Sequence, residues 1–181
     1  MKIEETTLPG VLMLTPEVYR DTRGGFCETW NRRVFSEAGL PTEWVQDNYS
    51  SSVKKVIRGI HYQVIQAQAK LVRVTQGAVF DVAVDLRRGS EHFGKHVAVE
   101  LSADNGRMLF IPVGFGHAFA ALTEHAGFSY KVTAYYSRAG ERTIRWDDPD
   151  LAIPWPLGPE EVIVSDKDRQ GQTLASAEVF P

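Results

Sequence analysis

The sequence predicts an all-β protein folded as a jelly-roll barrel. From residue 78 to residue 136, apolar and polar residues alternate with the period of two that is typical of β-strands. Turn-forming residues interrupt this alternation at Gly77 and at residues 88–90, 104–106 and 124–127. Strands therefore recur roughly every 8–12 residues, which is typical of a sandwich or barrel.

The composition indicates one soluble globular domain that spans residues 1–181. Hydrophobic residues make up 43% and charged residues 24%, and no apolar run approaches the ~18–20 residues that a membrane span needs. No apolar segment follows the first acidic residues, so we expect no signal peptide. The single cysteine, Cys27, has no partner for an internal disulfide, which favours the cytoplasm. A net charge of −3 argues against a nucleic-acid-binding surface, although a local cluster of cations could bind one phosphorylated ligand.

The N-terminal part of the chain predicts two strands and one helix. Residues 11–14 and 26–30 have the composition of strands, and residues 21–25 have that of the turn between them. Residues 31–39 predict a short helix, because Asn31 can cap its start and Gly39 can end it.

The remaining chain predicts strands followed by an irregular C-terminal segment. Residues Ala78, Phe80, Val82, Val84 and Leu86 share one face of a strand, and Asp81, Asp85 and Arg87 share the other. Further strands are predicted over residues 97–102, 108–112 and 128–136. The proline-rich stretch after residue 153 predicts loop and short helix packed on the barrel.

The stretch Ile57–Gln63 is the first candidate for chemistry. His61 lies within it, and Lys70 opens the next predicted strand. If the two strands are neighbours, the histidine could act as a base and the lysine as a fixed positive charge in one pocket. A buried core histidine beside a solvated lysine explains this stretch alone equally well.

Residues 112–117 contain the pattern P-x-G-x-x-H, ending at His117. This pattern is similar to the second motif of the cupins, a jelly-roll superfamily in which that histidine often joins an H-x-H pair and a glutamate around a metal. Here Gln63 replaces the second histidine, and Lys70 stands where an acidic ligand is sought. Because a cation repels a divalent metal, we expect no metal and no other cofactor.

A closer resemblance covers nearly the whole chain, from about Leu8 to Asp168. It is carried by motifs in a fixed order: residues 21–28, 46–51, 58–63, 70–74, 80–85, 111–117, 130–131, 144–148 and 165–168. Together they resemble the dTDP-4-dehydrorhamnose 3,5-epimerase family, whose members share the cupin fold. The resemblance implies a homodimer in which N-terminal strands cross to the partner, so that Arg23 or Glu28 could serve the other subunit's site.

The resemblance also implies roles for individual residues. His61 would be the catalytic base, Tyr130 the acid, Lys70 the group that stabilises the enolate, and Asp168 the partner of His61. Asp81 would support Lys70, and Tyr136, placed on the strand face of Tyr130, is a candidate for specificity. Nucleotide-sugar binding is implied for Arg23, Glu28, Gln46, Asn48, Arg58, His117, Glu141 and Lys167.

Epimerisation beside a ketone requires such a set. A ketone at sugar carbon 4 acidifies the hydrogens on carbons 3 and 5, and imidazole, which titrates near neutral pH, suits their removal. The enolate oxygen needs a fixed positive charge, and inversion needs a second residue that delivers a proton from the opposite face. A tyrosine phenol, with an ordinary pKa of about 10, can do so. Arginines suit the diphosphate.

Several alternatives remain open from sequence. Residues 64–69 and the alanines 118, 120 and 121 depart from the family pattern near the expected pocket, which leaves the exact sugar and nucleotide open. A relative could epimerise one carbon only, or act on another 4-keto nucleotide sugar such as a GDP-heptose. A metal-dependent cupin oxygenase or isomerase would contain iron, manganese or zinc, which elemental analysis detects. A non-catalytic sugar-binding cupin would not need base, acid and enolate stabiliser together.

Overall fold

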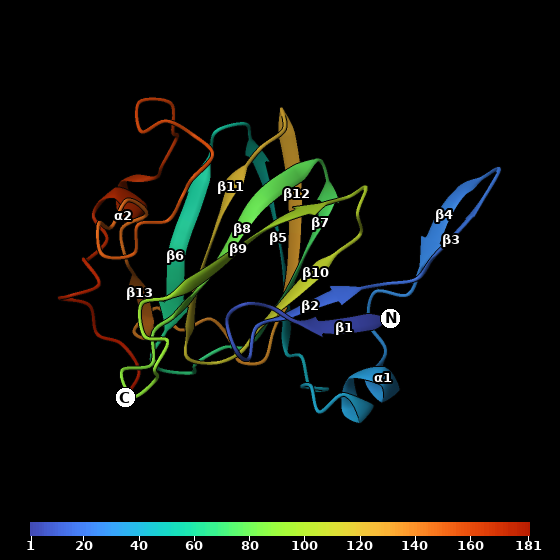
Figure 1. Ribbon diagram of the computed structural model, residues 1–181, viewed down its shortest axis with the longest axis horizontal. Helices are drawn as coiled ribbons and strands as arrows, with labels where there is room; N and C mark the ends of the chain where they lie inside the picture. The colour runs from blue at the N-terminus through green and yellow to red at the C-terminus, as the bar shows by residue number, and fades with distance from the viewer.

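Two antiparallel β-sheets face each other in the computed structural model, which describes residues 1–181 (Figure 1). The six-stranded sheet consists, in spatial order, of β1 (Lys2–Glu5), β2 (Leu12–Thr15), β10 (Met108–Ile111), β7 (Lys70–Gln76), β12 (His125–Val132) and β5 (Gln46–Val53). The five-stranded sheet consists of β13 (Glu141–Thr143), β6 (Ile57–Gln63), β11 (Phe115–Ala121), β8 (Ala78–Asp85) and β9 (His96–Ser102). The predicted all-β jelly roll is therefore confirmed.

The main hydrophobic core lies between the two sheets. It includes Val72 of β7 and Phe128 of β12 from one sheet, and Val79 of β8 and Phe119 of β11 from the other. Both faces of strand β8 are buried, so its alternating side chains pack in two different places. Val82 and the residues that share its face pack outward beneath the C-terminal segment. Asp81 therefore lies on the face that points into the barrel.

Two outer layers cover the sheets. The C-terminal segment, with the short helix α2 (Asp166–Arg169), packs on the five-stranded sheet, as predicted. Helix α1 (Arg32–Glu37) buries Phe35 against the six-stranded sheet, and the Asn31 side chain accepts hydrogen bonds from the first amides of the helix, as predicted. None of the helices is long and apolar enough to cross a membrane.

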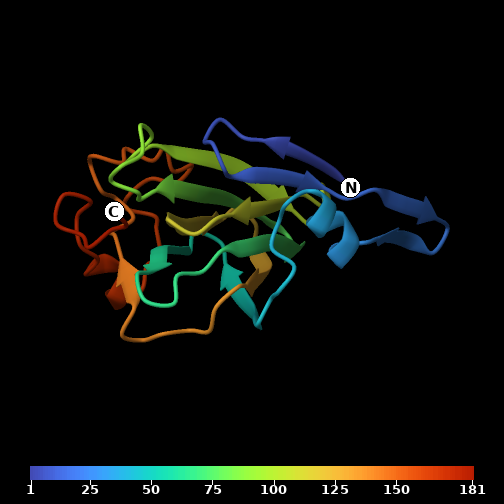
Figure 2. The ribbon, with the colours of Figure 1, turned by 90° about the horizontal axis from the view of Figure 1, so that it is seen from below.

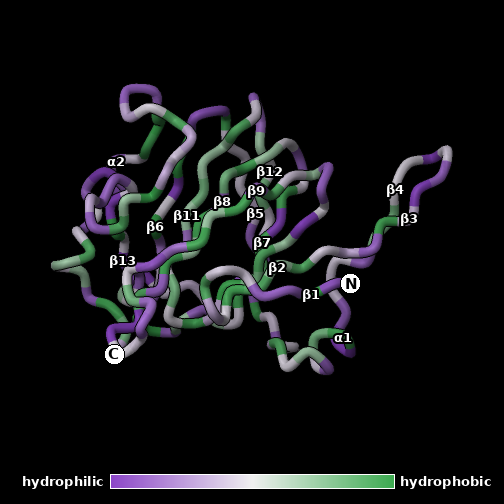
Figure 3. Tube along the Cα trace, in the orientation of Figure 1, coloured by the Kyte–Doolittle hydropathy of each residue, from purple (hydrophilic) through white to green (hydrophobic).

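A separate hairpin projects from the barrel. It consists of β3 (Val18–Asp21) and β4 (Gly24–Cys27), and Figures 1 and 2 both show it extending beyond the sheets, at the end opposite the C-terminal segment. The prediction for this region was partly wrong, because the second strand ends at Cys27 and pairs with β3 rather than with β2. Figure 3 shows that the tip of the hairpin is hydrophilic.

Candidate active site

A cavity of about 500 Å³ lies between the two sheets and is lined by side chains from both. Nine of the residues singled out from the sequence line it: Gln46, Asn48, Arg58, His61, Lys70, His117, Tyr130, Tyr136 and Glu141. The folding of two sheets face to face thus gathers residues that are up to about half the chain apart in sequence. Phe119 and Phe128 contribute a stacked pair of rings, with centroids 4.4 Å apart.

An irregularity in β6 places Arg58 and His61 in the same cavity. Residues three apart on a regular strand point to opposite faces. Here the pairing shifts: His61 pairs with His117 and Arg58 pairs with Phe119. A step of three residues along β6 therefore matches a step of two residues along β11. Gly59 allows this close approach, since a Cβ atom on it would lie 2.5 Å from the Cβ atom of Ala118.

His61 is held by a carboxylate from the C-terminal layer. Its Nε2 atom lies 2.6 Å from Oδ1 of Asp168, and Oδ2 of the same carboxylate accepts a hydrogen bond of 3.3 Å from the amide of Gly59. Burial of Asp168 opposes its ionisation. The hydrogen bond and charge of His61 outweigh that burial and hold the pKa of the carboxyl below its ordinary value. Asp168 itself is positioned by Ser165, whose hydroxyl accepts from its amide at the start of α2.

Lys70 is a buried cation that faces the cavity from the six-stranded sheet. It is only 8% exposed and makes one long hydrogen bond, 3.4 Å from Nζ to the carbonyl oxygen of His61. Burial lowers the pKa of Lys70 from 10.5 to about 8, although the negative charges of Asp81 and Glu141 oppose this shift. The ammonium form therefore predominates at neutral pH.

Next to Lys70, His117 forms a second imidazole–carboxylate pair. Its Nε2 atom lies 2.9 Å from Oδ2 of Asp81, which is fully buried. Burial lowers the pKa of His117 and outweighs the opposing effect of Asp81, while the charges of Lys70 and His61 lower it further. His117 is therefore neutral and donates its Nε2 hydrogen to Asp81.

Tyr130 lies on β12, in the sheet opposite the strand that carries His61. Burial raises the pKa of its phenol, and Glu141 adds to this effect, whereas the nearby charge of Arg58 opposes it. The phenol therefore remains protonated at neutral pH. Arg58 donates from Nε to the hydroxyl oxygen of Ser52 at 3.0 Å, and its guanidinium remains exposed beside the cavity.

Polar contacts also connect the mouth of the cavity to helix α2. Lys167 does not line the cavity, but its Nζ atom lies 2.5 Å from Oε1 of Glu141. Tyr136 donates from its hydroxyl to Oε2 of Glu141 at 3.0 Å. The placement of Tyr136 on the strand of Tyr130 was wrong, because β12 ends at Val132 and Tyr136 reaches the cavity from the following loop.

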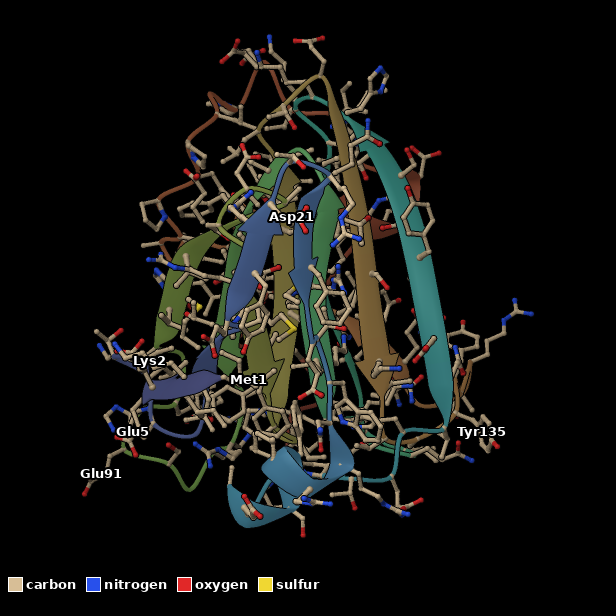
Figure 4. All side chains as sticks on the ribbon, turned by 90° about the vertical axis from the view of Figure 1, so that its right-hand side faces the viewer. Met1, Lys2, Glu5, Asp21, Glu91 and Tyr135 are labelled. Atoms are coloured by element: carbon tan, nitrogen blue, oxygen red, sulfur yellow. The ribbon has the colours of Figure 1, made fainter.

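The structure does not bring Arg23 and Glu28 to this cavity. Arg23 lies in the turn of the projecting hairpin, with its Nη2 atom 2.5 Å from Oδ2 of Asp21, and its side chain is 88% exposed. Figure 4 shows the labelled Asp21 at the tip of the hairpin, in front of the barrel. Glu28 follows β4 and accepts a hydrogen bond from Asn31.

The residues that depart from the family pattern contribute little to the lining of the cavity. Ala118, Ala120 and Ala121 are all buried in hydrophobic clusters and do not line the cavity. Of residues 64–69, only Gln68 lines it.

Gln63 has a structural role that sequence reasoning missed. Its amide nitrogen donates to the carbonyl oxygens of Gln66 and Tyr135, and its oxygen accepts from the amide of Ser137. It therefore holds the loop that carries Tyr136 in place.

No group of three or more His, Cys, Asp or Glu side chains is arranged to hold a metal ion. Ser50 also lines the cavity and was not predicted from the sequence. It alternates with Gln46 and Asn48, so the sequence pattern places all three on one face of β5.

Comparisons with known proteins agree with one another. The family model described as dTDP-4-dehydrorhamnose 3,5-epimerase matches residues 5–176. The dTDP-4-dehydrorhamnose 3,5-epimerase of Pseudomonas aeruginosa is 51% identical over 182 residues and covers 100% of both chains. The solved Legionella pneumophila dTDP-6-deoxy-D-glucose-3,5-epimerase, in complex with dTDP-4-keto-L-rhamnose, has a TM-score of 0.94 and 45% identity, covering 98% of this chain and 94% of its own.

A solved 3'-monoepimerase from Streptomyces bikiniensis, in complex with dTDP-quinovose, is similar as well. Its TM-score is 0.89 at 34% identity, covering 94% of this chain and 87% of its own. The match to the family model spans almost the whole chain, and the relatives align over nearly their full length. The chain therefore belongs to the dTDP-4-dehydrorhamnose 3,5-epimerase family and is an enzyme, a nucleotide-sugar epimerase with the cupin jelly-roll fold.

Proposed function

We propose that residues 1–181 act as one catalytic domain that converts dTDP-4-dehydro-6-deoxyglucose to dTDP-4-dehydrorhamnose by inverting carbons 3 and 5. One observation carries the proposal: a carboxylate-backed imidazole and a neutral phenol reach the same cavity from opposite sheets, beside a buried ammonium group. A base and an acid on opposite sides of a sugar ring are what inversion of a carbon requires.

In the first step, His61 removes the hydrogen from carbon 3 or carbon 5. Because Asp168 is ionised, it accepts the Nε2 hydrogen of the neutral ring, and the lone pair is then on Nδ1. The carboxylate also stabilises the imidazolium that forms when the proton is taken.

When the proton has left carbon 3 or carbon 5, the negative charge that remains resides on the oxygen at carbon 4. The ammonium of Lys70, with a pKa of about 8, is charged at neutral pH and can donate to that oxygen from within the buried pocket.

The scheme needs neither a metal nor a redox cofactor. Addition of a chelator is therefore not expected to reduce turnover, whereas a metal-dependent cupin would lose activity and regain it when the metal is returned.

In the final step, Tyr130 protonates the same carbon from the other side. Burial keeps the phenol protonated, and the charge of Arg58 can stabilise the phenolate that forms. The cycle is completed when the imidazolium returns its proton to solvent and the phenolate regains one.

Arg58→Ala is expected to raise KM strongly, by a factor of about ten to a hundred, with a smaller effect on kcat. The reason is that a charge-assisted hydrogen bond to a diphosphate contributes about 1.5–3 kcal/mol. Steady-state kinetics measures the effect, with the exposed Arg107→Ala as the matched loss of one positive charge away from the cavity. An unchanged KM for Arg58→Ala would place the diphosphate elsewhere.

We further propose that the protein is a homodimer in which the projecting hairpin completes the partner's site. Tyr19 and Phe26, which pair across the hairpin, are 59% and 71% exposed. Strand β5, which carries Gln46 and Asn48 of the cavity, lies at one of the two edges of its sheet. Exposed aromatic residues and an open sheet edge are features that a second copy could cover.

The cytoplasm is our proposal for the site of action, given the single, unpaired Cys27.

Complementation tests this assembly. Arg23→Ala weakens substrate binding in every site, and His61→Asn removes the base from every site. If Arg23 acts in the partner's cavity, mixed dimers contain one site with both residues intact, and co-expression gives more activity at low substrate concentration than either variant alone. If Arg23 acts within its own chain, mixing restores nothing.

The function itself is tested with dTDP-4-dehydro-6-deoxyglucose in deuterated water, with nuclear magnetic resonance detection of the products. Deuterium at carbons 3 and 5 with inversion at both is the expected result. The monoepimerase from Streptomyces bikiniensis, at 34% identity, makes inversion of a single carbon the second candidate. Deuterium and inversion at carbon 3 alone would favour it, and absence of exchange with this nucleotide would direct the search to other 4-keto nucleotide sugars.

A further inference from the structure

Glutamine side chains hold part of the loop between β12 and β13, which comprises residues 133–140. Residues 134–136 of this loop make no hydrogen bond to another backbone group. Side-chain amides bind them instead: Gln68 donates to the carbonyl oxygen of Ala134 (2.8 Å), Gln63 donates to that of Tyr135 (3.2 Å), and Gln46 accepts from the amide of Tyr136 (3.2 Å). The position of this segment therefore depends on side chains that lie outside the loop.

Gln63 makes the most contacts of the three, because its amide group binds three backbone groups at once. It is 4% exposed, and its nitrogen donates to Gln66 and Tyr135, while its oxygen accepts from the amide of Ser137 at 2.8 Å. A side-chain amide has two N–H donors and an acceptor oxygen, whereas a neutral imidazole has one donor and one acceptor. Only the amide matches two carbonyl oxygens and one N–H. Gln63 thus fixes the backbone on both sides of Tyr136.

Tyr136 is bound from both sheets at the mouth of the cavity. Its amide donates to Gln46 on β5 of the six-stranded sheet, and its hydroxyl donates to Glu141 on β13 of the five-stranded sheet. The side chain lines the cavity, yet the residue is 55% exposed. Tyr136 therefore faces the cavity on one side and solvent on the other.

We propose that Gln63 is a positioning residue: by holding Tyr136 at the mouth of the cavity, it keeps the sugar bound between the first inversion and the second. The inference rests on the proposed function, in which His61 and Tyr130 act in turn on carbons 3 and 5. After the first inversion the sugar either reacts again or leaves the cavity, and a residue at the mouth controls its release. Gln63 acts through Tyr136, because both of its N–H donors are already used by the loop backbone.

Gln63→Leu is expected to raise the ratio of singly to doubly inverted product at low conversion. The rise should be roughly two- to tenfold, the effect of losing one net hydrogen bond. The first incorporation of deuterium should change less, because the substitution leaves His61 and Tyr130 in place. The measurement uses dTDP-4-dehydro-6-deoxyglucose in deuterated water with nuclear magnetic resonance detection. Gln76→Leu is the matched control, since Gln76 is exposed and does not line the cavity. An unchanged ratio in Gln63→Leu would overturn the proposal.

A double variant distinguishes positioning of Tyr136 from a general loss of structure. Tyr136→Ala should itself raise the ratio, and adding Gln63→Leu to it should raise the ratio no further, because two residues that act through one another are not additive. Additive effects, or a parent ratio in Tyr136→Ala, would contradict the proposal. Tyr136→Ala alters an exposed side chain and is expected to fold. Gln63→Glu keeps the shape of the side chain but lacks both N–H donors, and it takes the place of Gln63→Leu if the latter does not fold.

Hydrogen exchange tests the positioning without any substrate. The amide of Tyr136 donates to Gln46 and not to Gln63, so it reports on the loop rather than on the bond that is removed. In 15N-labelled full-length protein, Gln63→Leu should speed its exchange severalfold, because the segment that carries it is released. The amide of Ile60, which donates to the carbonyl oxygen of Ile144 from the strand of Gln63, should exchange as in the parent protein. Exchange of the Tyr136 amide at the parent rate would show that Gln63 does not position it.

The parent protein separates failure of this inference from failure of the proposed function. A parent protein that inverts only one carbon, both at low conversion and at completion, refutes the double inversion and with it this role of Gln63. A parent protein that inverts both carbons, while Gln63→Leu keeps the same product ratio, retains the proposed function and refutes the role of Gln63 alone.

Discussion

His61→Asn is expected to remove the exchange of solvent deuterium into every carbon of the 4-keto sugar. Without the imidazole no base remains to abstract a proton, so the enolate does not form and no later step can occur. Loss of a general base costs on the order of 10²–10⁴ in rate. The amide of asparagine can still hydrogen-bond within the cavity, and the side chain is about a third exposed, so the fold is expected to survive.

Exchange is measured by incubating substrate and enzyme in deuterated water and following the signals of carbons 3 and 5. His125→Asn is the matched control, because this histidine lies on an exposed end of β12 and does not line the cavity. The control should exchange like the parent protein. Exchange at the parent rate in His61→Asn would mean that another group is the base, and the proposed mechanism would be wrong.

Tyr130→Phe is expected to separate proton removal from inversion. The variant keeps the ring and its packing against Phe128 but removes the phenol hydrogen. His61 can still form the enolate, and it can return a proton only to the face from which it took one. The expected products therefore contain solvent deuterium with retained configuration, and formation of the epimer falls by a factor on the order of 10²–10⁴.

Configuration and deuterium content are read from the same spectra. Tyr135→Phe serves as the control, since Tyr135 is 62% exposed and does not line the cavity. Epimerisation at the parent rate in Tyr130→Phe would identify a different acid. Tyr136 would then be the next residue to test, because it lines the same cavity.

The strand pattern could be read from the sequence because the barrel strands have a strict period of two. The N-terminal region was harder to predict, since the turn at residues 21–25 does not reveal whether the following strand pairs with β2 or forms its own hairpin. Similarly, the alternation up to Tyr136 continues past the end of β12. Only the pairing partners of a strand decide where it ends, and those partners are far away in the chain.

The sequence by itself determined the fold class, the family and most of the residues that line the cavity. It could do so because alternation, turn residues and ordered motifs are local properties of the chain. Only the tertiary structure decided that a shifted pairing in β6 brings Arg58 and His61 together, that Asp81 pairs with His117, and that Tyr136 reaches the cavity from a loop. These relations depend on contacts between strands and layers from distant segments, and burial changes the charge of a group only once those segments have excluded water.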